Sequence, residues 1–174
     1  RTSGESRTRT SLDLPGRQEM LVREVAAVGK PTVLVLIGGR PATINWADRN
    51  IPAILFAPSP GPQGGRAIAE ALFGDVNPGG KLSCTFPKSV GQLPLNFPTK
   101  PMANDEGISF RAAAAGPLYP FGHGLSYTTF AYSDLAISPA EAKPGQDVAV
   151  TVTVANAGDR AGDEVVQLYI RQVV

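Results

Sequence analysis

Apolar residues along the first ninety positions alternate between strand-like runs and helix-like spacing. Residues 32–37 (TVLVLI) are apolar or β-branched throughout, as in a strand covered on both faces of a parallel sheet. Helices are expected over residues 18–28 and 42–50, and a second strand over residues 51–56. The first helix gathers its apolar side chains on one face: Leu21, Val25 and Val28. This alternation predicts an α/β fold, with a doubly wound, mostly parallel sheet layer.

The stretch from residue 54 to residue 87 carries a second strand–helix–strand pattern. A helix opens at Gly64, and Ile68 and Leu72 share one of its faces at i, i+4 spacing. Gly74 follows the last periodic residue, where a left-handed cap needs a residue without Cβ. A turn is expected over residues 77–80 and another strand over residues 81–86. The pattern predicts a right-handed βαβ crossover between parallel strands.

Beyond residue 128 the apolar period changes to two. Strands are predicted from about residue 131, over residues 148–154, and over residues 165–170. Three strands fit the opening of a β-sandwich, which needs about seven. We therefore predict two domains, an α/β domain over residues 1–128 and a truncated β-sandwich over residues 129–174. Within the first domain, residues 94–116, rich in proline and alanine, are expected to form a long irregular connection that wraps the surface or lines a site.

Charge and composition exclude several classes of function. The chain has 16 basic and 15 acidic residues, so its net charge near +1 favours neither nucleic acid nor an anionic membrane as a partner. Its apolar runs are far shorter than the about 20 residues of a transmembrane helix. The single cysteine excludes an intramolecular disulfide and a multi-cysteine metal site. No metal and no cofactor are expected.

Three motifs, in order, resemble glycoside hydrolase family 3, the β-glucosidases and β-xylosidases. ALFGDVNPGGKL followed by TFPKSVGQLP (residues 71–82 and 85–94) resembles the family's C-terminal α/β domain. PLYPFGHGLSYTTF (residues 117–130) resembles the link into its terminal fibronectin-III-like domain. Near the start, Ser3-Gly4-Glu5 is followed by Arg9 and then by LDLP (residues 12–15), which resembles the family's acid/base segment.

The resemblance implies a retaining, exo-acting β-glycosidase acting on terminal β-linked sugars of an oligosaccharide or glycoside. Such hydrolysis needs two carboxyl groups about 5–5.5 Å apart. In this family the nucleophile is an aspartate on an N-terminal (β/α)8 barrel, which lies outside this chain. The acid/base role carries over to Glu5. Ser6-Arg7-Thr8 departs from the family's small residues, and Arg7 and Arg9 would lower the pKa of Glu5 if they pointed at it.

A second departure from the family lies in the turn before the helix at Gly64. Pro58 stands where an aromatic residue is expected, and Gln63 stands where the family has glutamate. Gly61 to Gly65 precedes a helix and could cradle a phosphate on its amides, but it lacks both the GxGxxG pattern and the Walker lysine. The departures bear on the local geometry of this loop.

The remaining candidates are interpreted as structural residues. His123 lies between two glycines and is read as a hydrogen-bonded loop residue. Cys84 is read as a buried thiol rather than a nucleophile. Trp46 is read as a packing anchor rather than a sugar-stacking platform. Asp48 and Asp75 are read as surface or capping carboxylates.

Two classes of function therefore remain. The first is the C-terminal part of a family 3 β-glycosidase, whose site is completed by the barrel of the same protein. The alternative is a non-catalytic α/β interaction or small-ligand-binding module, which a true start just before Arg1 would favour. The compartment stays open, with the periplasm or secretion favoured over the cytoplasm.

Overall fold

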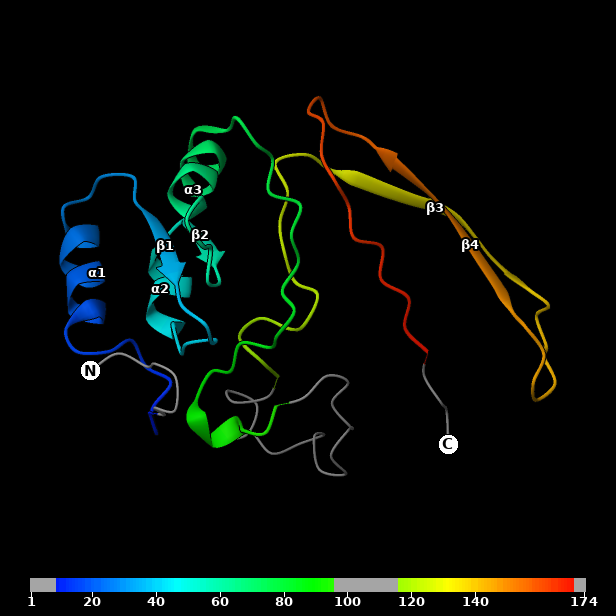
Figure 1. Ribbon diagram of the computed structural model, residues 1–174, viewed down its shortest axis with the longest axis horizontal. Coiled ribbons are helices and arrows are strands. Elements are labelled where there is room, and N and C mark those ends of the chain that lie inside the picture. Colours follow the sequence, from blue (N-terminus) through cyan, green and yellow to red (C-terminus); the bar gives the residue numbers. More distant parts are fainter. Residues whose placement is uncertain (1–8, 96–115, 171–174) are drawn as a thin grey trace. The chain divides into compact units, whose positions relative to one another are not determined.

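The computed structural model describes residues 9–95 and 116–170. The chain forms two compact units, and each is built from two separate stretches (Figure 1). Unit 1 holds residues 1–69 and 82–123, and unit 2 holds residues 70–81 and 124–174. The domain boundary at residue 128 stays a prediction. The fold is mixed α/β, with one parallel and one antiparallel pair of strands among the described residues.

The first half of the chain alternates helix and strand as the sequence predicts. In order, the elements are α1 (Gln18–Ala27), β1 (Val33–Ile37), α2 (Asn45–Asn50), β2 (Ala53–Ala57) and α3 (Gly64–Phe73). A short 3₁₀ helix, η1, spans Val90–Gln92. The two strands pair in parallel, with Leu34 opposite Ile54 and Leu36 opposite Phe56. Because parallel strands need a crossover connection, α2 supplies it here.

The core of unit 1 gathers around one face of this parallel pair. Its buried members are Leu36, Ala42, Ile44, Ala47, Ile51 and Phe86. The ring of Phe86 is 2% exposed. It meets Phe56 edge-on at 5.0 Å and Tyr119 at 5.9 Å between ring centroids, a geometry that favours aromatic pairs. Phe86 thus joins strand β2 to the stretch that follows residue 116.

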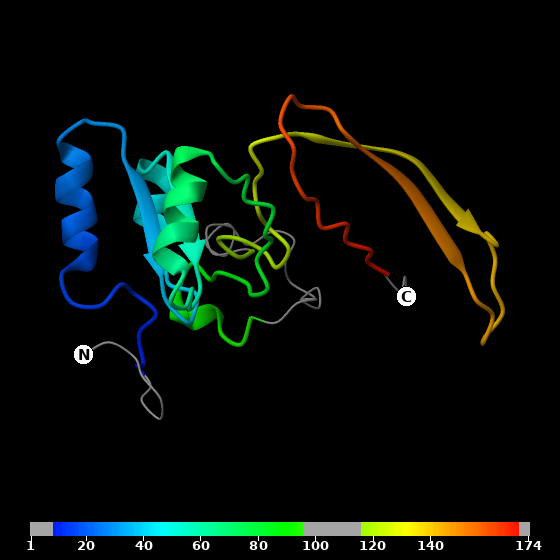
Figure 2. The ribbon, with the colours of Figure 1, turned by 45° about the horizontal axis from the view of Figure 1, so that its top comes forward.

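Helix α1 lies beside the parallel pair in both views of the ribbon (Figures 1 and 2). Val22 and Ala26 of this helix pack against the core. The row predicted to share one face is exposed instead, with 62% of Leu21, 45% of Val25 and 69% of Val28 accessible. Helix α1 is therefore apolar on two sides, of which the described residues cover one.

Strand β1 is less buried than its sequence predicts. Only Leu36 is fully buried, while Val33 is 49% and Ile37 is 62% exposed. The expectation of a strand covered on both faces is therefore wrong for the described residues. The reason is that successive strand residues point to opposite faces, and only the face carrying Leu34 and Leu36 meets the core.

The strand predicted over residues 81–86 does not form, so the βαβ crossover predicted over residues 54–87 is wrong. This stretch instead bonds backbone to backbone with residues 118–123, and one isolated antiparallel bridge joins Phe86 to Tyr119. Leu82 N donates to His123 O at 2.8 Å, and Phe86 N donates to Tyr119 O at 2.8 Å. The pairing does not extend into a regular ladder, because the chain turns at Phe121 and Gly122, where Gly122 takes a φ of +80°.

Unit 2 contains an antiparallel hairpin of β3 (Phe130–Ser138) and β4 (Ala149–Asn156). Their register shifts between Ser133 and Ala136, where Asp134 takes a positive φ of 54°. The predicted third strand, residues 165–170, is wrong: no strand is assigned there. No strand among the described residues pairs with it, and 65% of Leu168 and 94% of Ile170 are exposed.

The side chain of Asn77 ties three stretches of unit 2 together. Its Oδ1 accepts from the backbone N of Tyr127 at 2.7 Å and from Ser126 Oγ at 3.1 Å. Its Nδ2 donates to Ala161 O at 3.0 Å. A Cβ on Gly162 would fall 2.4 Å from that same Nδ2, so a larger residue there would push the Asn77 carboxamide out of its present position. The turn predicted over residues 77–80 is wrong: the chain turns over residues 74–76 instead, and Asn77 follows that turn and joins three stretches of unit 2.

The end of helix α3 and Lys81 are also held by side-chain contacts in unit 2. Gly74 has a φ of +82°, as its predicted role as a left-handed cap requires, and its carbonyl accepts from Arg160 Nη2 at 2.5 Å. Lys81 Nζ donates to Gly124 O at 2.8 Å and lies 3.5 Å from Glu164 Oε2. Both of these charged side chains are largely shielded, at 13% and 15% exposure.

Replacing Phe86 with alanine should destabilise unit 1 by about 3–5 kcal/mol, since the change removes a fully buried ring and leaves a cavity. Urea unfolding of the chain, followed by the fluorescence of Trp46, its only tryptophan, measures this. Phe73→Ala is the matched control, because that ring is 86% exposed. Equal unfolding midpoints for the two variants would contradict the central place of Phe86.

Candidate active-site segment

The predicted acid/base, Glu5, lies in residues 1–8, outside the described part of the chain. Its role therefore stays a prediction. The described part of the chain begins at Arg9, so it includes Arg9 and the LDLP residues 12–15 of the acid/base motif but not Glu5. From Arg9 to Pro15 the backbone and side chains are placed, and this stretch shows how the segment is held.

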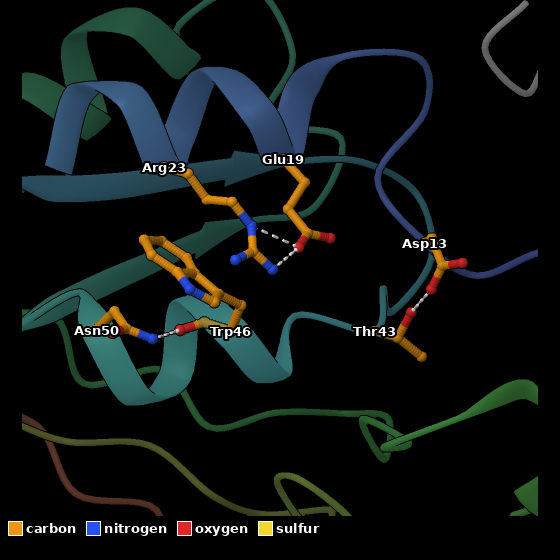
Figure 3. A network of polar contacts seen from close by, with 6 residues as sticks. All are labelled: Asp13, Glu19, Arg23, Thr43, Trp46 and Asn50. Atoms are coloured by element: carbon orange, nitrogen blue, oxygen red, sulfur yellow. Dashed lines mark hydrogen bonds and ion pairs between the residues drawn. The ribbon is translucent and has the colours of Figure 1, made fainter. Parts of the chain in front are cut away.

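Two neighbouring stretches of unit 1, residues 11–13 and Thr43, are joined through backbone and side chain. Thr43 N donates to Leu12 O at 3.0 Å, and Asp13 and Thr43 form a parallel bridge. Thr43 Oγ1 also donates to Asp13 Oδ1 (Figure 3). Thr43 is 7% exposed and sits between two buried residues, Ala42 and Ile44. The core thus supplies a fixed base for the segment.

The carboxylate of Asp13 is held by two hydroxyl groups. Besides the bond from Thr43, Ser11 Oγ donates to Asp13 Oδ2 at 2.9 Å and accepts from Asp13 N at 3.0 Å. The bonds from Thr43 and Ser11, together with the charge of Arg9, lower the pKa of Asp13 against a smaller opposing effect of burial. Asp13 is therefore ionised at neutral pH, which strengthens both hydrogen bonds.

Arg9 is turned toward the same aspartate. Its Nη1 donates to Asp13 O at 3.0 Å. Its Nε is buried and has no hydrogen-bond partner in the described part of the chain. The sequence left open whether the Arg9 side chain points at Glu5. In the structure, one guanidinium nitrogen of Arg9 donates to the carbonyl oxygen of Asp13.

Helices α1 and α2 meet through a cation–π contact (Figure 3). The Arg23 guanidinium lies 4.6 Å from the centre of the Trp46 ring, and Arg23 Nε donates to Glu19 Oε1 at 2.9 Å. Trp46 also packs against the core, and its carbonyl accepts from Asn50 Nδ2 at 2.7 Å. The interpretation of Trp46 as a packing anchor is confirmed, since Arg23 lies over its ring.

His123 and Asp48 flank Tyr119. The His123 ring stacks on Tyr119 at 5.0 Å with 12° between planes, and His123 N donates to Pro120 O at 3.1 Å, so the loop interpretation is confirmed. Tyr119 Oη donates to Asp48 Oδ1 at 2.5 Å. Burial and the neighbouring Asp48 raise the pKa of Tyr119. Sequence reasoning missed this role of Asp48, because no local pattern links residues so far apart.

The remaining candidate residues form no second reactive or metal-binding site within the described part of the chain. Cys84 is half-buried, and burial raises the pKa of its thiol, which disfavours the reactive thiolate. No group of three or more His, Cys, Asp or Glu in residues 9–95 and 116–170 could hold a metal ion. No helix in those ranges is long and apolar enough to cross a membrane.

The chain is similar to known proteins over nearly its whole length. A β-xylosidase of Formosa agariphila is 44% identical over 172 residues, which cover 98% of this chain and 24% of that protein. A periplasmic β-glucosidase of Salmonella typhimurium is 42% identical over 179 residues, covering 97% of this chain and 23% of that protein. This chain thus spans about a quarter of the length of these relatives.

Solved structures agree with these relatives. A β-glucosidase of Erythrobacter marinus has a TM-score of 0.82 and 48% identity, over 92% of this chain and 21% of that one. A β-glucosidase of Listeria innocua in complex with isofagomine has a TM-score of 0.78 and 35% identity, over 91% of this chain and 23% of that one. Residues 1–127 match the glycosyl hydrolase family 3 C-terminal domain. The chain therefore belongs to glycoside hydrolase family 3, as its motifs predict.

Proposed function

We propose that this chain is the C-terminal part of a retaining, exo-acting β-glycosidase of the β-glucosidase or β-xylosidase type. The observation that carries the proposal is the family match over residues 1–127, with relatives named β-xylosidase and β-glucosidase. The complete enzyme would add a (β/α)8 barrel of the same protein, which brings the nucleophilic aspartate. The substrate is a terminal β-linked sugar of an oligosaccharide or glycoside.

Glu5 is the general acid/base of this proposal. In the first step Glu5 protonates the glycosidic oxygen while the barrel aspartate attacks the anomeric carbon and forms a glycosyl-enzyme. In the second step Glu5 takes a proton from water, which attacks the same carbon and releases the sugar with its β configuration. The motif order supports the assignment, since Arg9 and LDLP follow Glu5 at the family's spacing.

We propose the finer fold assignments on similar grounds. The parallel pair β1–β2 with its helical connection supports a doubly wound α/β domain over residues 1–128. The hairpin of β3 and β4, with its period of two, supports the start of a fibronectin-III-like sandwich over residues 129–174. The exposed apolar side chains of this hairpin fit a partial sandwich, for example Leu135 at 68% and Ile137 at 54%.

Anomer-resolved NMR on the complete enzyme tests the proposed function. With 4-nitrophenyl β-glucoside and β-xyloside, at least one should be hydrolysed and the first sugar formed should be the β anomer, while the α-glycosides should stay intact. Formation of the α anomer first would rule out retention. Failure to hydrolyse either β-glycoside would rule out the proposed substrate class.

A further inference from the structure

We propose that Asp13 and Thr43 form an anchor that positions the acid/base segment, so that both are positioning residues for proton transfer by Glu5. This inference rests on the proposed function of Glu5. The anchor is the set of contacts that joins residues 9–13 to Thr43: the backbone bond from Thr43 to Leu12, the side-chain bond from Thr43 to Asp13, and the bonds of Arg9 and Ser11 to Asp13.

The anchor shortens the length of chain between Glu5 and the nearest fixed point. Glu5 precedes Asp13 by eight positions, and eight residues of extended chain span at most about 26–29 Å. Arg9 is fastened to the same point by its bond to Asp13 O at 3.0 Å. Glu5 precedes Arg9 by four positions, which span at most about 13–14 Å. Fastening Arg9 thus halves the greatest distance that the sequence allows between Glu5 and the anchor.

A positional restraint of this kind acts on proton transfer because the tolerance is small. A general acid must come within about 2.6–3.2 Å of the oxygen that it protonates. Displacement by about 1 Å can cost about 10²-fold in rate even when the change is remote from the chemistry. Thr43 is suited to fix the segment, since it is buried between core residues and donates through both its backbone and its side chain.

A purely structural role would show a different kinetic pattern. If Asp13 and Thr43 only stabilised the fold, their loss would lower the activity toward every substrate in the same proportion. A glycoside with an acidic leaving group needs little protonation, whereas one with a basic leaving group depends on the acid. The ratio of kcat/KM for the glycoside with the basic leaving group to that for the glycoside with the acidic leaving group therefore measures the contribution of the general acid.

The experiment compares dinitrophenyl and phenyl β-glycosides in the complete enzyme. Thr43→Val keeps the shape of the side chain and removes its hydroxyl, and should lower kcat/KM for the phenyl glycoside about 10–100-fold while the dinitrophenyl glycoside loses less than about threefold. Thr43→Ser keeps the hydroxyl and should restore the wild-type ratio. Asp147→Asn, at an exposed loop position, is the charge-matched control for Asp13→Ala.

Each outcome decides the proposal. The proposal is overturned if the ratio of kcat/KM for the two glycosides is unchanged in Thr43→Val and Asp13→Ala. This includes the case in which both kcat/KM values fall by the same factor. If these variants fail to fold, Ser11→Ala replaces them, because it removes one donor to Asp13 and leaves the core intact; its ratio must then move in the same direction. Glu5→Ala runs alongside. If the ratio changes in Glu5→Ala but not in Thr43→Val, the anchor is ruled out and the role of Glu5 stands. If the ratio does not change in Glu5→Ala, the assignment of Glu5 as the acid/base is itself ruled out.

Discussion

Glu5→Ala in the complete enzyme should slow hydrolysis of a phenyl β-glycoside by about 10²–10⁴-fold, the usual contribution of general acid catalysis. The dinitrophenyl glycoside should be far less affected in its first step, because dinitrophenolate leaves without a proton. Its second step should still suffer, since water then has no base, and the glycosyl-enzyme should accumulate. Steady-state kinetics with both substrates measure the difference.

Azide gives the same prediction an independent readout. With the carboxylate removed, a small anion can enter the vacated space and attack the glycosyl-enzyme without a base, so azide should restore part of the rate and yield a β-glycosyl azide. Glu141→Ala, at an exposed loop position, is the control and should show neither the loss nor the rescue. Equal losses for both leaving groups, with no azide product, would show that Glu5 is not the acid/base.

The isolated chain of 174 residues should hydrolyse no glycoside. Retention requires two carboxyl groups acting on one sugar ring, and the proposal assigns only Glu5 to this chain. Loss of one member of a catalytic unit costs several powers of ten, so the rate should fall at least about 10⁴-fold below that of the complete enzyme. Release of nitrophenol from 4-nitrophenyl β-glucoside, at equal molar concentrations, measures it.

The control for that measurement is the same chain carrying Glu5→Gln, which keeps the size of the side chain and removes its acidity. Both preparations should give the background rate of substrate alone. Turnover by the unaltered chain above its Glu5→Gln counterpart would mean that a second carboxyl group within this chain completes the site, and the proposed division of labour with a barrel would fail.

The sequence was most informative where structure depends on neighbours along the chain. Residues 32–37 carry a strand signal in every position, and β1 forms there. Gly74 follows a helical period, and it caps α3 with a positive φ. Each of these features depends on backbone preferences within a few residues, which a single sequence records.

Predictions failed where distant residues decide the outcome. Residues 81–86 have the composition of a strand, but their backbone groups bond to residues 118–123, which turn at Phe121 and Gly122 and so offer no continuous partner strand. Residues 165–170 have an equally strong strand pattern and find no pairing strand among the described residues. A segment forms a strand only when a second segment pairs with it, and the sequence of one segment does not show whether that partner lies beside it.

The same limit applies to the candidate site. The motif around Glu5 could be read from residue types and spacing, but the side chains that hold the segment could not. Asp13 and Thr43 are 30 positions apart, and Asp48 and Tyr119 are 71 apart. An aspartate and a hydroxyl residue are common on any surface, so only the folded backbone shows which pairs meet.

The contacts of Asn77 bear on how unit 2 can form during synthesis. Its carboxamide bonds to Ser126, Tyr127 and Ala161, the last of them 84 positions further along the chain. A ribosome adds about 5–20 residues per second, so Ala161 is made about 4–17 s after Asn77. Ser126 and Tyr127 are made within that interval, but the Asn77 carboxamide still lacks its bond to Ala161. Residues 70–81 must therefore wait for Ala161 to complete these contacts, and translation speed as well as sequence sets how long they stay open to chaperones and proteases.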